Sequence, residues 1–225
     1  MRGALKCRGM SNWISKCRGF LLLVACSFAL LLSAGERRSV YLLPHIALQG
    51  SGIMVNQELR SAGLIGYRVG LLGEWVFSEG VLGKLSLVTG MEVTRKGGVY
   101  DVHSSYPIVQ SHAVEAPLLL SLTVHVTREV DCFLQGGAYA GYSFRNSLEH
   151  FPSSRWQEEQ TLRQRPFFCP YDYGMRFGAG AEWRRWIWSI GTTLSRYDFY
   201  IDRYSGDTPY HLSHRTLFTS VGYRF

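Results

Sequence analysis

The last nine residues of the chain, Leu217–Phe225, alternate between two kinds of side chain. One set is mostly apolar and ends in aromatic residues: Leu217, Thr219, Val221, Tyr223 and Phe225. The other set is smaller and more polar: Phe218, Ser220, Gly222 and Arg224. Successive side chains of a β-strand point to opposite faces, so this pattern predicts a strand with two different faces. Such a strand suits a position with lipid on one side and a packed lumen on the other.

Period-two alternation recurs along the chain and predicts eight strands, at 44–55, 64–77, 84–95, 113–126, 132–144, 173–184, 186–197 and 216–225. Most of them reach the roughly 9–11 residues that a tilted strand needs to cross a bilayer. The connections alternate in length, and the long ones are 56–63, 96–112, 145–172 and 198–215. Outer-membrane barrels have long extracellular loops and short periplasmic turns. We therefore predict an all-β fold, an eight-stranded antiparallel up-and-down transmembrane β-barrel.

The segment 173–184 illustrates the two faces. One face carries Tyr173, Met175, Phe177, Ala179, Ala181 and Trp183, and the other carries Gly174, Arg176, Gly178, Gly180, Glu182 and Arg184. Glycine weakens a strand and packs nothing on a solvated face, whereas inside a narrow tube it leaves room for side chains from opposite walls. The apolar face is therefore predicted to contact lipid. Aromatic residues gather near the predicted strand ends, as in the interfacial girdles of such barrels, although aromatics favour strands in any context.

The first 35 residues have the pattern of a secretory signal peptide. Five basic residues precede an apolar run at 20–34, and small residues at 33–35 offer a cleavage site. The run is short for a membrane-spanning helix, which needs about 20 apolar residues. Translation from Met10 and a lipoprotein signal that acylates Cys26 are alternatives. We predict a cleaved signal peptide at 1–35 and a barrel domain at 36–225.

Removing the signal peptide changes the charge of the chain. The whole sequence has 24 basic and 17 acidic residues, and the segment from 36 onward has 19 and 17. The basic character is therefore mainly a targeting feature, and no nucleic-acid partner is predicted. Cys132 and Cys169 are predicted at opposite ends of the barrel, on the order of 25 Å apart, which is beyond the roughly 7 Å reach of a disulfide.

Seven charged residues fall on the inward face of the predicted strands: Arg68, Glu74, Glu92, Glu115, Arg176, Glu182 and Arg224. Buried charges must be paired, so we predict a lumen ion-pair network that plugs the barrel. A gated ion path through the same residues is the functional alternative. No metal site and no cofactor are predicted.

The pair His211 and Ser213 is the best candidate for catalysis. Residues two apart on a strand point the same way, and a histidine oriented by an acid, Glu115 or Asp207, can activate a serine. The segment lies in a predicted loop, however, and two-residue matches are common by chance. His211 and His214 as a metal pair lack a clear third ligand. Loop 145–172 carries mixed charge and is either solvated or a surface for lipopolysaccharide phosphates or a protein partner.

Three stretches resemble the PorT-like outer-membrane β-barrel family of Bacteroidetes-type bacteria. Residues 114–120 (VEAPLLL) are similar to the family's EIPLLL strand, 133–142 (FLQGGAYAGY) to its LQAGPYLGY strand, and 221–225 (VGYRF) to its LGYRF ending. The resemblance covers about 43–225 and implies a barrel whose C-terminal strand, with Val221, Tyr223 and Phe225, is a signal for the barrel assembly machinery. It implies no reaction. The founding member is linked to protein secretion, and Pro117 implies a tolerated local bend.

These observations together predict an integral outer-membrane protein of Gram-negative type with a plugged lumen. Its expected role is a structural or interaction platform that presents extracellular loops, not an enzyme. A narrow pore or a component of a protein-secretion machine is the first alternative, a lipid-modifying enzyme is the second, and a soluble secreted barrel is the third. The expected partners are outer-membrane lipid, lipopolysaccharide, the assembly machinery, and a secretion-system or extracellular protein.

Overall fold

A computed structural model describes residues 40–55, 58–59, 61–100, 108–149, 171–195, 200–201 and 211–225. The predicted signal peptide and Cys169 lie outside these residues, as do Asp207 and most of loop 145–172. Within the described ranges no helix is long and apolar enough to cross a membrane.

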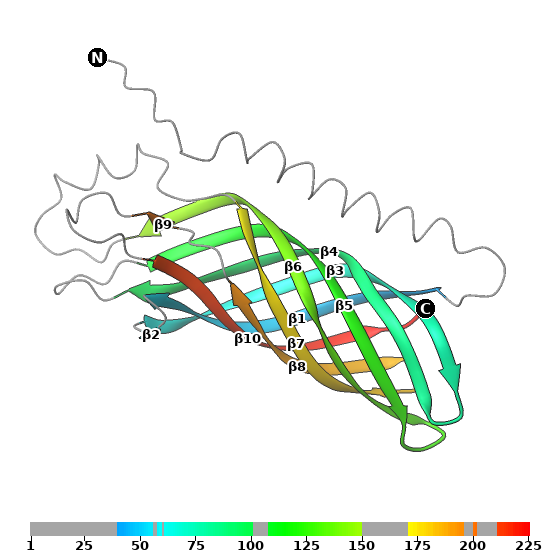
Figure 1. Cartoon of the computed structure of the whole chain (residues 1–225). Coiled ribbons are helices and arrows are strands. Elements are labelled where there is room, and N and C mark those ends of the chain that lie inside the picture. The colour runs from blue at the N-terminus through cyan, green and yellow to red at the C-terminus, as the bar shows by residue number, and fades with distance from the viewer. Residues whose placement is uncertain are drawn as a thin grey trace, which may run out of the picture. The chain divides into compact units, whose positions relative to one another are not determined.

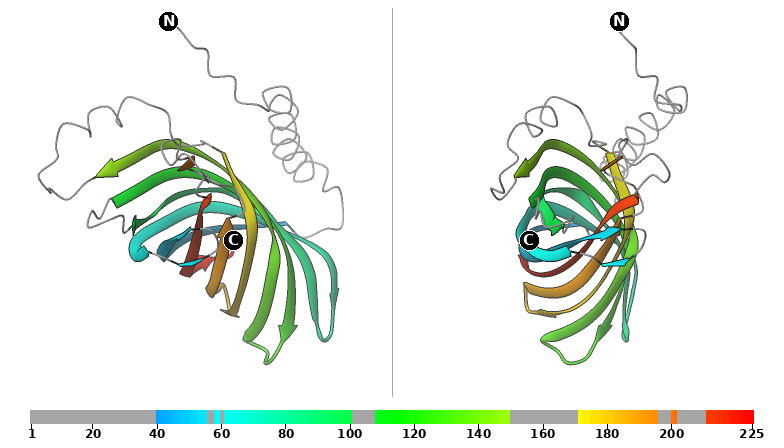
Figure 2. Two further views of the ribbon diagram at one scale, coloured as in Figure 1. Left: turned by 60° about the vertical axis from the view of Figure 1, so that its left-hand side comes forward. Right: turned by 90° about the vertical axis from the view of Figure 1, so that its left-hand side faces the viewer.

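Eight long strands form one closed antiparallel barrel (Figures 1 and 2). They are β1 (Val40–Val55), β3 (Ser61–Gly80), β4 (Gly83–Tyr100), β5 (Ile108–His125), β6 (Val130–Glu149), β7 (Tyr171–Trp183), β8 (Trp186–Ser195) and β10 (His211–Tyr223). Each pairs with its neighbour in the chain, and β1 pairs with β10 from His45 opposite Gly222 to Val55 opposite Leu212. Two short strands, β2 (Glu58–Leu59) and β9 (Tyr200–Ile201), pair with the end of β1 and the start of β10, respectively. The predicted eight-stranded up-and-down barrel is confirmed.

Several strands are longer than the sequence pattern predicts. Strands β3 to β6 have 18–20 residues, well beyond the roughly 9–11 that a bilayer requires. Residues 96–100 and 108–112 were predicted to be loop, and the structure places them in β4 and β5. The alternation weakens there because the strands continue past the apolar belt, where neither face needs to match lipid. The short turns lie at Val81–Leu82, 126–129 and Arg184–Arg185.

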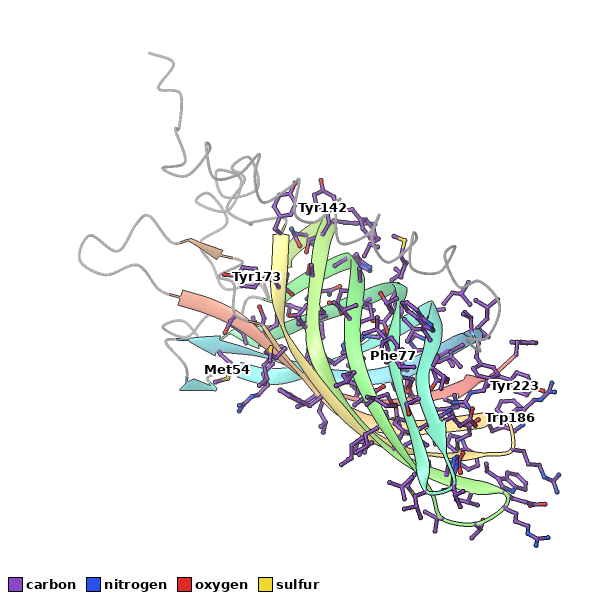
Figure 3. The ribbon with its side chains drawn as sticks, turned by 45° about the vertical axis from the view of Figure 1, so that its right-hand side comes forward. Met54, Phe77, Tyr142, Tyr173, Trp186 and Tyr223 are labelled. Carbon is purple, nitrogen blue, oxygen red and sulfur yellow. The ribbon has the colours of Figure 1, made fainter. Side chains whose placement is uncertain are left out.

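The two faces of each strand lie where the alternation predicts. On β7, Met175 and Phe177 are exposed while Arg176 between them is 2% exposed. On β5, Leu120 and Leu122 are exposed while Leu119 and Ser121 are buried. Aromatic side chains mark both ends of the wall, and Figure 3 shows Tyr142 and Tyr173 at one end and Trp186 and Tyr223 at the other. An apolar outer surface on a closed barrel is the surface of a membrane-spanning protein.

Pro117 lies in a central strand, where proline removes a ladder hydrogen bond. It points into the barrel and is almost completely buried. The pairing of β4 with β5 is interrupted at this point, between Thr89 opposite Leu118 and Glu92 opposite Glu115. The missing N–H of Pro117 therefore coincides with a gap in the ladder, which is consistent with the predicted local bend.

The C-terminal residues are fixed to neighbouring strands. The Phe225 amide donates to the carbonyl of Leu42 at 3.0 Å, and the Arg224 amide donates to the carbonyl of Arg185 at 2.8 Å. The Tyr223 ring packs edge-on against Trp186 and Phe225, with centroids 5.2 and 4.8 Å away. Val221 and Phe225 are exposed on the outer surface.

Candidate functional site

The charged side chains of the lumen form two clusters at different heights. The loop-side cluster lies nearer the four long connections and consists of Arg68, Glu92, Lys96, Glu115, Asp172 and Arg176. The turn-side cluster lies nearer the short turns and consists of Glu74, Lys84, Glu182 and Arg224. The strand alternation directs all ten side chains inward, where they meet across the barrel.

Arg176 holds the centre of the loop-side cluster. Its Nη1 donates to Glu92 Oε2 at 2.6 Å and its Nη2 donates to Glu115 Oε2 at 2.7 Å. Arg68 approaches the same two carboxylates, with Nε 3.6 Å from Glu92 Oε2 and Nη2 3.5 Å from Glu115 Oε2. These ion pairs join strands β3, β4, β5 and β7 across the lumen, and the two contacts of Arg176 are short, charge-assisted hydrogen bonds.

Lys96 and Asp172 extend the cluster toward the long connections. Lys96 Nζ donates to Glu115 Oε1 at 2.9 Å and also pairs with Asp172. Asp172 accepts hydrogen bonds from Tyr139 Oη at 3.0 Å and from Ser195 Oγ at 2.5 Å. Every carboxylate of the cluster is thus held by more than one partner, which is what buried acids require.

Aromatic rings cover the cations of this cluster. The Phe218 ring centroid lies 4.7 Å from the Arg68 guanidinium carbon and 6.0 Å from that of Arg176. The Tyr139 ring lies 5.6 Å from both Lys96 Nζ and the Arg176 guanidinium carbon. A cation that lies over a ring face gains electrostatic attraction while water is kept away from it.

The turn-side cluster is smaller and more open. Arg224 bridges two acids, with Nη2 2.6 Å from Glu74 Oε2 and Nη1 2.6 Å from Glu182 Oε1. Lys84 Nζ lies 3.2 Å from Glu74 Oε1, which also accepts a hydrogen bond from Ser86 at 2.8 Å. The Arg224 side chain is 16% exposed, whereas Glu115 in the other cluster is completely buried.

An apolar layer separates the two clusters. Leu43, Val88 and Leu119 form its buried core, and Tyr41, Leu72 and Ile187 pack against them. On β3, for example, Leu72 lies between Arg68 of the loop-side cluster and Glu74 of the turn-side cluster.

A cavity of about 80 Å³ reaches from one cluster to the other beside this layer. Its lining includes His45, Arg68, Arg176 and Arg224. The Nε atoms of Arg176 and Arg224 and the Nδ1 of His45 have no hydrogen-bond partner among the described residues, while His45 Nε2 lies 2.9 Å from Glu92 Oε1. A polar cavity of this size has room for several water molecules, and we expect water to form hydrogen bonds with these three nitrogen atoms.

The charges in each cluster balance. The loop-side cluster has three cations and three carboxylates, and the turn-side cluster has two of each. Such an arrangement leaves no uncompensated charge to attract an ion of either sign. Chemically, it fills and cross-links the barrel.

The structure brings together all seven inward charges that the sequence singled out. Arg68, Glu92, Glu115 and Arg176 meet in the loop-side cluster, and Glu74, Glu182 and Arg224 meet in the turn-side cluster. The sequence reasoning missed four partners: His45, Lys84, Lys96 and Asp172. The parity of β4 could have revealed Lys84 and Lys96, because both share the inward face with Glu92.

The catalytic candidates do not form a site with Glu115. His211 and Ser213 were predicted to lie in a loop, and the structure places both in β10. Ser213 is half-buried and lies on the same face of its strand as the exposed Leu217. Glu115 points into the lumen, where it forms ion pairs with Arg176 and Lys96. The His211 side chain lies outside the described residues, as does the alternative acid Asp207. Among the described residues, no three His, Cys, Asp or Glu side chains converge as metal ligands would.

No protein-family model matches the chain, and no curated protein matches it in sequence. Solved structures of similar fold include Ail of Yersinia pestis, with 13% identity over 83% of this chain and 99% of Ail and a TM-score of 0.41. Neisserial surface protein A is 10% identical over 84% of this chain and 100% of its own, with a TM-score of 0.42. The outer membrane enzyme PagL is 10% identical over 77% of this chain and 97% of its own, with a TM-score of 0.43. The PorT-like resemblance stays a prediction.

Proposed function

We propose that this protein is an integral barrel of a Gram-negative outer membrane whose lumen is closed and whose loops form a structural or interaction platform. One observation carries the proposal: two charge-balanced clusters cross the lumen at different heights, with apolar side chains and a cavity of about 80 Å³ between them. The outward apolar face supports the membrane position, because such a surface in water would promote aggregation.

The orientation follows from the connections. The three short turns lie at one end, together with the start of β1 and the end of β10, and the long connections lie at the other. Barrels of this type place their turns in the periplasm and their loops outside the cell. The segments available to a partner are then mainly 101–107, 150–170 and 196–210. The partner class is an extracellular protein or a component of a secretion system.

Conductance tests the closed lumen. The purified barrel is first shown to be folded by its different migration in boiled and unboiled gel samples, and is then inserted into planar bilayers. We expect no steady current at moderate voltage, because Arg176, Glu92 and Glu115 block the lumen. Steady single-channel currents from folded wild-type protein would instead establish the pore alternative.

We propose that the last strand, β10, with the residues that follow it, is recognised by the barrel assembly machinery. Val221 and Phe225 present apolar side chains outward, and Tyr223 packs between Trp186 and Phe225. We expect Phe225→Ser to lower the amount of folded barrel in cell membranes while refolding into vesicles in vitro is nearly unchanged. An equal loss in both assays would assign Phe225 to stability and not to recognition.

A further inference from the structure

A row of basic side chains crosses the outer surface of three neighbouring strands near the loop side. Arg95 on β4 is directly opposite His112 on β5, and His112 is directly opposite Arg145 on β6. Adjacent strands are about 4.8 Å apart, so the backbone positions of this basic row span about 10 Å. All three residues belong to the outward face, since Thr94, Lys96, Ala113 and Ser143 beside them are the buried ones.

A break in the strand register adds Arg145 to this row. The register of β5 with β6 shifts between His112 and Ala113, so that Phe144 and Arg145 both lie beside His112. Both are exposed, and the Phe144 ring centroid is 6.3 Å from that of His112. Such bulges re-aim side chains, and this one places an arginine and an aromatic ring together on the outer surface.

The basic row has no acidic partner among the described side chains. Neither Arg95 nor Arg145 forms an ion pair with a described residue, and the acids on this half of β4 and β5, Glu92 and Glu115, point into the lumen. Arg95 is held in place by Gln110, whose Oε1 accepts from Nη2 at 2.9 Å, while Arg95 Nε has no acceptor. The two arginines lie on either side of His112 and repel each other across it, so an anion from outside would stabilise this arrangement.

The surface on the turn side of the basic row is apolar. Val93 and Met91 follow Arg95 along the outer face of β4, and Leu120 and Leu122 are exposed farther along β5. On β6, the outward positions beyond Tyr142 are small, namely Ala140, Ala138 and Gly136. A ligand on the basic row is therefore at the edge of the lipid belt, where its apolar part would lie against these strands.

We propose that Arg95, His112 and Arg145 bind the phosphate groups of a phosphorylated lipid in the outer leaflet, of the lipid A type, whose acyl chains lie along the outer face of β4 to β6. The cations and the apolar surface adjoin one another, which suits an amphiphile better than a free phosphate ion. Arginine forms bidentate, charge-assisted hydrogen bonds with phosphate oxygens, and two arginines on either side of a histidine can contact one or two phosphates. This inference depends on the proposed membrane orientation.

Native mass spectrometry of the full mature barrel in detergent tests the proposal. The probe is bisphosphorylated lipid A, with phosphatidylethanolamine as a zwitterionic lipid and inorganic phosphate as a competitor. We expect R95Q/R145Q to bind lipid A at least about tenfold more weakly than wild type, which corresponds to a loss of about 1.4 kcal/mol. The matched control is R184Q/R185Q, which removes two arginines from the turn at the opposite end and should bind within about twofold of wild type.

Unchanged lipid A binding by folded R95Q/R145Q would overturn the proposal. Displacement of lipid A by millimolar inorganic phosphate, or equal binding of phosphatidylethanolamine, would also overturn it, because the site would then not select a phosphorylated lipid. If R95Q/R145Q does not fold, the exposed single variant R145Q replaces it, with an expected loss of at least about threefold. A barrel that does not conduct and does not bind lipid A would contradict only this inference. A barrel that conducts ions and binds lipid A would contradict only the proposal of a closed lumen.

Discussion

The two faces of a single strand differ sharply in this protein, both in polarity and in exposure. On β7, Arg176 and Phe177 are consecutive, yet Arg176 is 2% exposed and Phe177 is 44% exposed. Among the described side chains, 22 polar or charged residues are buried and, besides Pro117, only ten apolar ones, while 30 large apolar residues are exposed. Polar contacts therefore hold the interior of the barrel together, whereas the apolar outer surface requires lipid around it.

The difference between the faces implies different responses to the same kind of change. On the inner face, a substitution acts through a hydrogen-bonded network in which each charge has several partners. On the outer face, it acts through transfer between lipid and water, and depth in the membrane sets the cost. Paired variants on the two faces can separate these mechanisms.

We expect the largest effect at the centre of the loop-side cluster. Glu115→Gln removes the negative charge that Arg176 and Lys96 share, and leaves an excess cation at a position where the carboxylate is completely buried. Breaking such a buried pair costs about 3–5 kcal/mol of unfolding free energy. Urea unfolding of the barrel in vesicles, followed by tryptophan fluorescence, measures this loss.

The control for this change is Glu129→Gln in the 126–129 turn. The Glu129 side chain is 57% exposed and 3.5 Å from Arg184, so we expect less than about 0.5 kcal/mol. A loss below about 1 kcal/mol in Glu115→Gln would show that water solvates Arg176 and Lys96 well enough to replace the carboxylate.

The next largest effect is expected on the lipid-facing surface. Leu120 is exposed on the apolar outer face of β5, next to Leu122, and Leu120→Arg would place a cation in hydrocarbon at a cost of about 2–4 kcal/mol. Val81, in the turn that joins β3 and β4, is 96% exposed, and Val81→Arg there should cost no more than about 1 kcal/mol. Unfolding in vesicles measures both variants, and equal effects would contradict the membrane position of Leu120.

A third pair compares glycines on the two faces of the β1–β3–β4 region. A Cβ on the inward-facing Gly66 would lie 1.9 Å from the carbonyl oxygen of Arg95, which also accepts a hydrogen bond from Gln49 at 2.8 Å. A Cβ on the exposed Gly50 would meet nothing within 4 Å. We expect Gly66→Ala to cost about 1–3 kcal/mol and Gly50→Ala to cost almost nothing. Equal denaturant midpoints for the two variants would show that β3 and β4 can move apart at Gly66 at little cost.

These glycines also show what the sequence could and could not predict. The sequence indicated that inward glycines relieve crowding, and it attributed the crowding to side chains from opposite walls. At Gly66 the obstacle is the backbone of the neighbouring strand, and the same holds at Gly174, where a Cβ would lie 1.9 Å from the carbonyl oxygen of Leu194. Alternation shows which face a residue occupies, but not how far each strand slides past the next.

The same limit explains the site. Arg68, Glu92, Glu115 and Arg176 were assigned to the lumen from parity alone, and the structure places them in contact. Lys96 and Asp172 were assigned to loops, because the strands were expected to end with the apolar belt. The bulge at His112 that leaves Phe144 and Arg145 both outward has no periodic signal at all.

The smallest effect is expected in the turn-side cluster. Arg224→Gln removes the bridge between Glu74 and Glu182, but Lys84 stays within 3.8 Å of both acids and the site is open to water at one side. We expect a loss of about 1–2 kcal/mol of unfolding free energy, smaller than for Glu115→Gln. Because this cluster is partly solvated, added salt should narrow the difference between wild type and variant, whereas the effect of Glu115→Gln should hardly change with salt. If both variants lost the same stability and responded alike to salt, the two ends of the lumen would be equally sealed, and periplasmic water would not reach Arg224.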